Sequence, residues 1–133
     1  MTGKVYGTED ATYKAAGEFD GIKKLVDDFY DIMSELNESK KIREMHPSDL
    51  EVSRDKLTRF LCAWTGGPRL YKEKYGAISI PQAHSHLTIG GAERDAWLLC
   101  MKQALAKQGY TQEFQDYMIA QLGVPAERCR NAD

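Results

Sequence analysis

The chain has 133 residues, of which 42% are hydrophobic and 29% charged, and its formal net charge is -2. This length fits one domain with a buried core, and the composition excludes wholesale disorder and a membrane-embedded protein. The only basic doublets are Lys23-Lys24 and Lys40-Lys41, which is too little positive charge for a nucleic-acid surface.

The first predicted element is an amphipathic helix. Apolar residues recur at helical spacing from Ile22 to Leu36, and Asp20 precedes them as the expected cap. A polar segment from Asn37 to Glu44 follows, and it predicts one or two helical turns before Pro47 interrupts the chain.

A second helix is expected after Pro47. Residues 48–51 have the form of a capping box, and apolar residues at helical spacing continue from Val52 to Trp64. Gly66-Gly67-Pro68 is a typical helix stop. Ser53 shares a helix face with Leu57, Phe60, Leu61 and Trp64, so we expect it to point inward.

The last third of the chain begins with an irregular stretch. Residues 69–89 show no sustained period and predict a loop with a short helix or strand. Beyond Gly90-Gly91 the pattern predicts a helix that contains Trp97 and ends at Gly109. Thr111 is the expected cap of a final helix, and residues from about 124 onward predict a polar tail of the same single domain, 1–133.

Local motifs exclude several classes of function. The sequence has no GxGxxG, P-loop, HExxH, GxSxG or CxxC motif, which removes most enzyme classes with a short signature. Cys62, Cys100 and Cys129 are far apart and odd in number, which argues against disulfides or a zinc site. Residues 1–20 lack a signal-peptide pattern, and no run of eighteen apolar residues occurs, so we expect a cytoplasmic protein with no membrane contact.

Tyrosine, tryptophan and histidine residues are candidates for a functional site, and each also has a purely structural interpretation. Tyr30 and Trp97 lie among apolar residues, as core aromatics usually do. His84 and His86 fit surface positions, and as a pair they would lie on one side of a strand but about 200° apart on a helix. His46 fits a turn before Pro47. Residue types and spacing alone therefore indicate a soluble helical domain.

Four segments carry a more specific signal. They are KKLVDDFYD (23–31), SRDKL (53–57) with GGP (66–68), LYKEKYG (70–76) and AERDAWLLCM (92–101). In this order and with these gaps they closely resemble the bacterial group II truncated haemoglobins, over roughly Gly17 to Leu122. The resemblance implies an all-α truncated globin fold, a two-over-two helical sandwich around a non-covalent haem b with its iron.

The same resemblance implies the iron ligand. The family's proximal histidine lies six residues before the glycine that opens the tryptophan-bearing helix, and counting back from Gly90 gives His84. His86 falls outside that register, so we expect it only near a haem edge. A neutral His84 would bind through one ring nitrogen and donate its other N–H to a backbone carbonyl.

On the distal side the family's ligand-facing positions match Tyr30, Trp97, His46, Ser53 and Leu57. A phenol or indole N–H is a strong donor in a low-dielectric pocket, which would slow the release of an electron-rich ligand. His46 is expected to bond to Tyr30 or the ligand, and either His46 or Tyr30 could approach iron when no ligand is bound. Ser53 leaves room for entry, and Leu57 keeps part of the wall dry.

Two departures from the family affect the haem edge. Arginines often precede the proximal histidine, whereas this chain has SIPQA (79–83), so we expect the propionates to pair with Lys56, Lys74, Tyr75 or His86, and Phe60 to contact the haem. The family's Gly-Gly corner is Ala16-Gly17 here.

Three functions compete at this point. The first is a haem protein that reversibly binds dioxygen, nitric oxide and related diatomic ligands, for oxygen binding or for detoxification of reactive nitrogen and oxygen species. The second is a haem enzyme, a nitric oxide dioxygenase or a peroxidase-like protein, which would need an external reductant such as a reductase. The third, a haem-free helical interaction module, is disfavoured by His84 in register with a polar distal trio. Monomer and homodimer are equally open.

Overall fold

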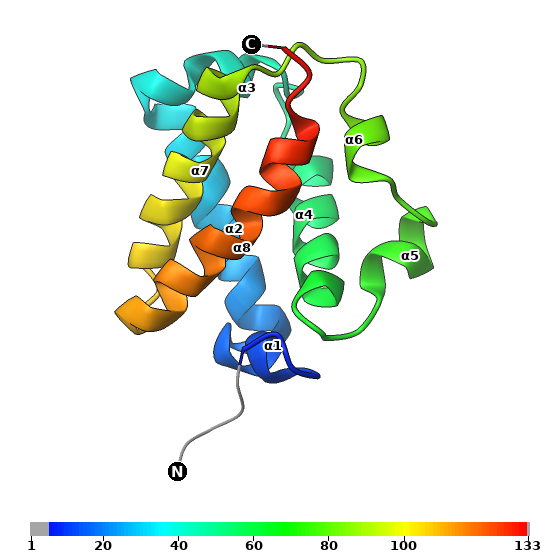
Figure 1. The fold of residues 1–133 in the computed structure, drawn as a ribbon, viewed down its shortest axis with the longest axis vertical. Coiled ribbons are helices and arrows are strands. Elements are labelled where there is room, and N and C mark those ends of the chain that lie inside the picture. Colours follow the sequence, from blue (N-terminus) through cyan, green and yellow to red (C-terminus); the bar gives the residue numbers. More distant parts are fainter. Residues whose placement is uncertain (1–5, 133) are drawn as a thin grey trace.

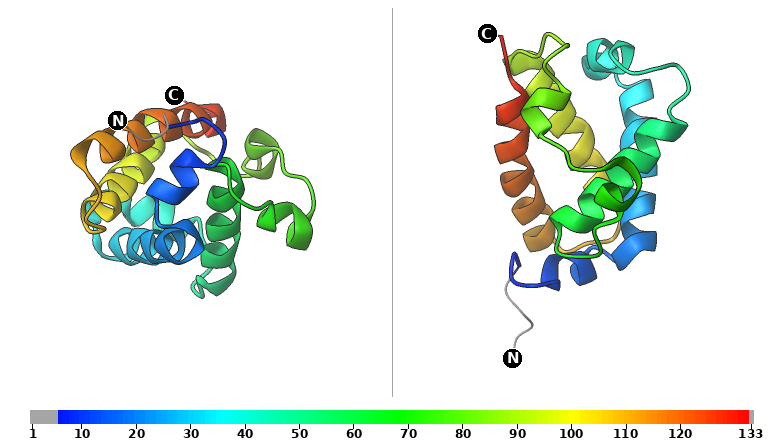
Figure 2. Two further views of the ribbon diagram at one scale, coloured as in Figure 1. Left: turned by 90° about the horizontal axis from the view of Figure 1, so that it is seen from below. Right: turned by 90° about the vertical axis from the view of Figure 1, so that its right-hand side faces the viewer.

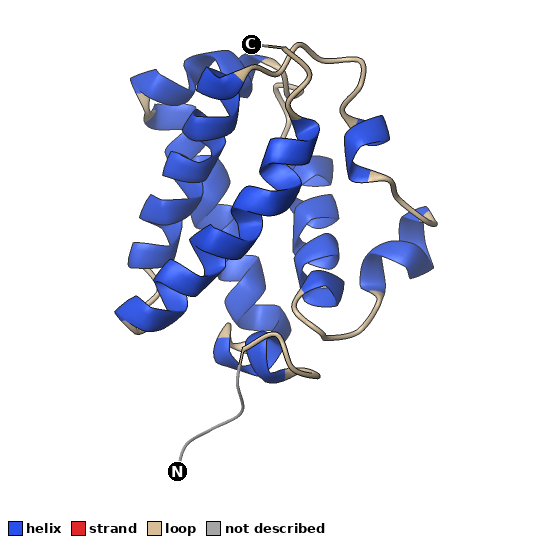
Figure 3. Ribbon diagram, in the orientation of Figure 1, coloured by secondary structure: helices blue, strands red, loops and turns tan. Residues whose placement is uncertain are grey.

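Helices form all the regular structure between residues 6 and 132, the part of the chain that this computed structural model describes (Figure 3). In chain order they are α1 (Ala11–Ala15), α2 (Glu18–Glu35), the 3-10 turn η1 (Asn37–Ser39), α3 (Lys40–Glu44), α4 (Glu51–Trp64), α5 (Leu70–Tyr75), α6 (Ile80–Ala83), α7 (Gly91–Ala106) and α8 (Gln112–Cys129). Within those residues no helix combines the length and the apolar character needed to cross a membrane. The expected all-α class is confirmed.

Four long helices are arranged as two pairs. Helix α2 packs against α4 and α7, and α7 packs against α8. Figure 1 shows α7 and α8 crossing in front of α2, and the turned view in Figure 2 separates α8 on one side from α2 on the other. This is the expected two-over-two sandwich. Helices α5 and α6 form an outlying segment beside α4 and α8.

The apolar faces of these four helices form the core. The largest fully buried side chains include Phe29, Leu25, Leu61, Met101 and Phe114. Burying each such side chain contributes about 1.5–3 kcal/mol to folding. The core is therefore built by the helical stripes that the sequence pattern predicts.

Two predicted helix starts are wrong. Helix α2 begins at Glu18 rather than after Asp20, and its N-cap is Gly17 at φ 95°. A glycine takes this left-handed conformation without strain, which turns the chain into α2. The capping box predicted at residues 48–51 is also absent, because α4 begins after Leu50 and has no side-chain cap. By contrast, Thr111 caps α8 as expected, and its hydroxyl accepts the Phe114 N–H at 3.1 Å.

The prediction of a polar tail from about residue 124 is wrong, because most of these residues are helical. Helix α8 continues through Pro125 to Cys129. Proline lacks the N–H that would bond to the carbonyl of Gln121, but Gln121 is exposed, so water can solvate that carbonyl. Residues 69–89 form two short helices rather than a strand.

Candidate functional site

A cavity of about 370 Å³ lies among α2, α4, α6, α7 and α8. Most of its lining is apolar and includes Leu57, Phe60, Leu61, Ile80, Leu87 and Ile89. Its size and lining fall within the range of small-molecule sites in proteins. We call it the central cavity.

The central cavity receives all five predicted distal residues, which are Tyr30, Trp97, His46, Ser53 and Leu57. The rings of Tyr30 and His46 meet edge to face with centroids 5.6 Å apart. Phe29 packs edge to face against Tyr30 at 4.9 Å and against Trp97 at 5.1 Å. Phe29 therefore holds the two predicted donors at the same wall.

Tyr30 has a buried ring and a hydroxyl without a protein partner. The side chain is 5% exposed, and burial raises its pKa to about 12, partly offset by the positive charge of Arg54. Among residues 6–132, neither the Tyr30 hydroxyl nor the Trp97 indole N–H forms a hydrogen bond. Every fully buried side-chain polar atom in these residues has a hydrogen-bond partner, so these two groups are not fully buried. Both donors therefore face the open space of the central cavity, and the phenol stays protonated at neutral pH.

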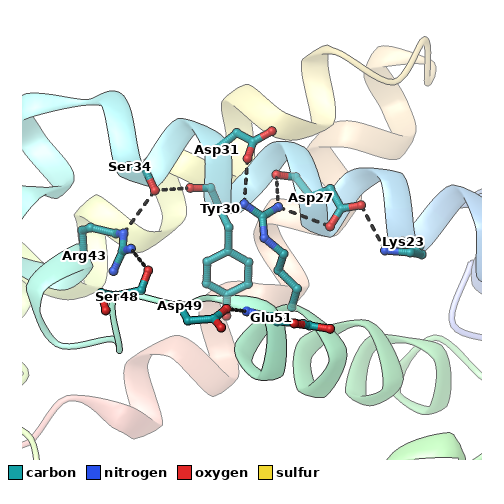
Figure 4. A network of polar contacts seen from close by, with 10 residues as sticks. Lys23, Asp27, Tyr30, Asp31, Ser34, Arg43, Ser48, Asp49 and Glu51 are labelled. Atoms are coloured by element: carbon teal, nitrogen blue, oxygen red, sulfur yellow. Dashed lines mark hydrogen bonds and ion pairs between the residues drawn. The ribbon is translucent and has the colours of Figure 1, made fainter.

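An arginine supports Tyr30 from α4. Arg54 donates to the Asp27 backbone carbonyl at 2.9 Å, to the Asp27 carboxylate at 3.2 Å and to the Asp31 carboxylate at 2.7 Å. Its guanidinium lies 5.8 Å from the centre of the Tyr30 ring. Figure 4 shows Tyr30 projecting from α2, with Asp27 and Asp31 on the same helix. The contacts join α4 to α2 beside the phenol.

A second arginine fixes the turn that follows His46. Arg43 donates to the Ser34 hydroxyl at 3.1 Å and to the carbonyls of Pro47 and Ser48 at 3.0 and 2.9 Å. Ser34 in turn donates to the Tyr30 carbonyl at 2.9 Å (Figure 4). This network ties the turn to α2.

His46 and His84 have the same local arrangement. His46 Nδ1 lies 2.8 Å from the Ile42 carbonyl oxygen, and His84 Nδ1 lies 2.8 Å from the Ile80 carbonyl oxygen. A carbonyl only accepts, so Nδ1 carries a proton in each ring, and Nε2 is the nitrogen that has the lone pair when the ring is neutral. Burial lowers the pKa of His46, the hydrogen bond to the Ile42 carbonyl partly offsets this, and the positive charge of Arg43 lowers the pKa further. The contact at His84 is the backbone hydrogen bond that the sequence predicts.

The predicted haem-edge residues do not all reach the central cavity. Lys56, Phe60 and His86 line it. Lys74 and Tyr75 do not, because both bind the carboxylate of Asp55, at 3.0 and 2.5 Å. Lys56 lies 5.3 Å from the Tyr75 ring and forms no ion pair with the described carboxylates.

Sequence reasoning missed one wall of the central cavity. Leu122, Pro125, Ala126 and Cys129 of α8 all line it. Their offsets of three, four and seven residues from Leu122 are typical of one helix face, so the signal was present in the sequence. The proline concealed it, because proline usually ends a helix.

The comparison with known families decides the relationship. The family model described as bacterial-like globin matches residues 11–130. The chain belongs to the bacterial-like globin family. It is 32% identical over 122 residues to the group 2 truncated haemoglobin YjbI of Bacillus subtilis, covering 92% of this chain and 89% of that protein. The predicted group II truncated haemoglobin membership is confirmed.

Solved structures agree. The group II two-on-two haemoglobin of Agrobacterium tumefaciens superposes with a TM-score of 0.87 at 30% identity, covering 99% of this chain and 98% of that one. The truncated oxygen-avid haemoglobin of Bacillus subtilis gives 0.81 at 33% identity, over 91% and 99% of the two chains. Members of the family bind haem b without a covalent bond, so this globin is a haem protein that binds small gas ligands.

The residues of the central cavity fit a haem. Its apolar walls suit a porphyrin, and the Ile80 carbonyl engages Nδ1 of His84, which leaves Nε2 as the ring nitrogen that would bind haem iron. Within the described residues no group of three or more histidine, cysteine or acidic side chains could hold a bare metal ion.

Proposed function

We propose that this globin reversibly binds dioxygen and related diatomic ligands, with His84 as the iron ligand and Tyr30, Trp97 and His46 as the polar contacts to the gas. The observation that carries the proposal is the placement of these four side chains. All four line the central cavity, but His84 follows α6, which packs against α8, whereas Tyr30 belongs to α2, which packs against α4 and α7.

A haem bound here would supply an iron atom that binds diatomic gases. His84 would hold that iron in one orientation, because its Nδ1–H is bound to the Ile80 carbonyl and cannot turn away. Lys56 is a charged group at the cavity wall with no carboxylate partner among residues 6–132, and it would pair with a propionate.

Tyr30, Trp97 and His46 would hold the gas. A protonated Tyr30 phenol and the Trp97 indole donate hydrogen bonds to an electron-rich ligand, and low polarity around them strengthens those bonds. Neutral His46 offers Nε2 as an acceptor for the phenol. Leu57 and Phe60 exclude water, and the small Ser53 leaves space for entry. Such a set of donors favours slow release of dioxygen.

The iron-ligand assignment is tested by His84→Gly, with His86→Ala as the matched control from the same loop. We expect His84→Gly to lose the haem Soret band or to recover it only with added imidazole, whereas His86→Ala keeps it. A normal Soret band and normal haem affinity in His84→Gly would contradict the assignment.

The distal assignment is tested by Tyr30→Phe, which removes only the hydroxyl. Loss of one strong hydrogen bond predicts a dioxygen off-rate about ten- to a hundredfold higher. Stopped-flow displacement of dioxygen by carbon monoxide measures this rate. An unchanged off-rate would show that Tyr30 does not hold the ligand.

A further inference from the structure

The segment that follows α8 is bound to the loop that follows His84. Asn131 accepts the Ile89 N–H through Oδ1 at 2.8 Å and donates through Nδ2 to the Leu87 carbonyl at 2.6 Å. The backbone N–H groups of Asn131 and Ala132 both donate to the Ile89 carbonyl, at 2.8 and 3.0 Å. Four hydrogen bonds thus connect two segments more than forty residues apart in the chain.

This loop is the direct continuation of His84. The Leu87 N–H donates to the His84 carbonyl at 3.0 Å, and Leu87 and Ile89 both line the central cavity. Helix α6, which precedes His84, has four residues and is too short to be stable by itself. The position of the imidazole therefore depends on contacts outside α6.

Ion pairs fix the end of α8, from which Asn131 extends. Glu127 accepts from Arg94 of α7 at 2.6 Å and from Arg130 at 2.9 Å. These guanidinium groups lower the pKa of Glu127 to about 2. The end of α8 is thereby joined to α7, which begins two residues after Ile89 of the loop that Asn131 binds.

We propose that Asn131 is a positioning residue for His84. By binding both Leu87 and Ile89, its amide fixes the loop and thereby the direction in which the imidazole presents Nε2 to the central cavity. The inference rests on the proposed assignment of His84 as the iron ligand. It adds a residue from the far end of α8 to the proximal side of the site.

The test compares Asn131→Ala with Gln121→Ala in the haem-loaded protein. Gln121 is an exposed amide on α8 with no hydrogen bond through its side chain in the described structure, so its removal controls for a general loss of polar surface. We expect Asn131→Ala to transfer haem to excess apomyoglobin roughly five- to tenfold faster than Gln121→Ala, because two hydrogen bonds are lost. The iron–histidine stretching band of the ferrous protein, measured by resonance Raman, should shift or broaden in Asn131→Ala alone.

A third variant separates the two bonds of the amide. Asn131→Asp keeps the acceptor for the Ile89 N–H and loses the donor to the Leu87 carbonyl, so we expect an intermediate rate of haem loss. If Asn131→Ala matches Gln121→Ala in both measurements, the positioning role is wrong. Faster haem loss with an unchanged iron–histidine band and a lower thermal midpoint would mean a purely structural role, and would also overturn it.

His84→Gly, measured in parallel, distinguishes the two proposals. If His84→Gly loses the iron–histidine band and Asn131→Ala leaves it unchanged, the role of Asn131 fails and the ligand assignment stands. If His84→Gly keeps the band, the ligand assignment fails, and the positioning role fails with it.

Discussion

Helix α2 and the segment from α5 to α6 both contribute to one cavity, yet they are held in place by different forces. Helix α2 has seven buried residues, among them Phe29 and Tyr30. Helix α5 has none. Its Leu70 packs against the core but is only partly buried. Polar contacts also attach the segment, at one end between Asp55 and the side chains of α5, and at the other between Asn131 and the loop after His84.

The difference predicts two kinds of response to mutation. Apolar burial contributes to the stability of the whole domain, because removing it leaves a cavity in close-packed surroundings. Exposed hydrogen bonds and ion pairs contribute little to global stability, but they select one geometry for a flexible segment. Substitutions in the core of α2 should therefore destabilise the whole domain, whereas substitutions in the α5–α6 segment should shift that segment without unfolding the domain.

The largest expected effect is on global stability, from Phe29→Ala. Phe29 is fully buried between Tyr30 and Trp97, so its truncation should lower the free energy of unfolding by about 3–5 kcal/mol. Ile80→Ala on α6 is the counterpart, and because Ile80 is only half-buried we expect a loss of about 1 kcal/mol or less. Urea unfolding of both variants measures the difference. Equal losses of unfolding free energy in the two variants would contradict the expected difference between α2 and the α5–α6 segment.

A smaller effect is expected from Arg54→Leu, with Arg59→Leu as its control on the same helix. Arg54 contacts Tyr30 and the two aspartates of α2, whereas Arg59 pairs with Asp55. Loss of this support should raise the dioxygen off-rate by roughly threefold to fivefold, corresponding to about 1 kcal/mol. Arg59→Leu should leave the off-rate unchanged, and a similar increase in both variants would argue against specific support of Tyr30.

The smallest effect concerns pH at the attachment of α5. Hydrogen bonds from Tyr75, Lys74 and Arg59 lower the pKa of Asp55 to about 2. A lowered native pKa means that this carboxylate stabilises the fold fully above pH 4 and loses that contribution as the pH falls toward 2. We expect Asp55→Asn to melt about 2–4 °C below the wild type at pH 6, and the gap to narrow to roughly half by pH 3 and to close only as the pH approaches 2. A gap that stays constant from pH 6 to pH 3 would exclude this linkage.

Local patterns predicted most of the fold and part of the cavity. Helical apolar stripes located the long helices, and Thr111 was correctly identified as a cap. The starts of α2 and α4 were misplaced, because Gly17 turns the chain by its conformation and the N-cap of α4 is Leu50, which offers no side-chain cap. Pro125 concealed the last turn of α8, where tertiary contacts outweigh the cost of one missing hydrogen bond.

The sequence by itself determined the helical class and the family, because these depend on the order and spacing of residues, and the register of the family's motifs predicts His84 rather than His86 as the iron ligand. Only the tertiary structure showed that Lys74 and Tyr75 bind Asp55 rather than line the cavity, and that Asn131 reaches the loop after His84. These contacts join residues from 19 to 44 positions apart. Hydrogen bonds at such separations arise from the packing of helices against one another, and no local period in a single chain records them.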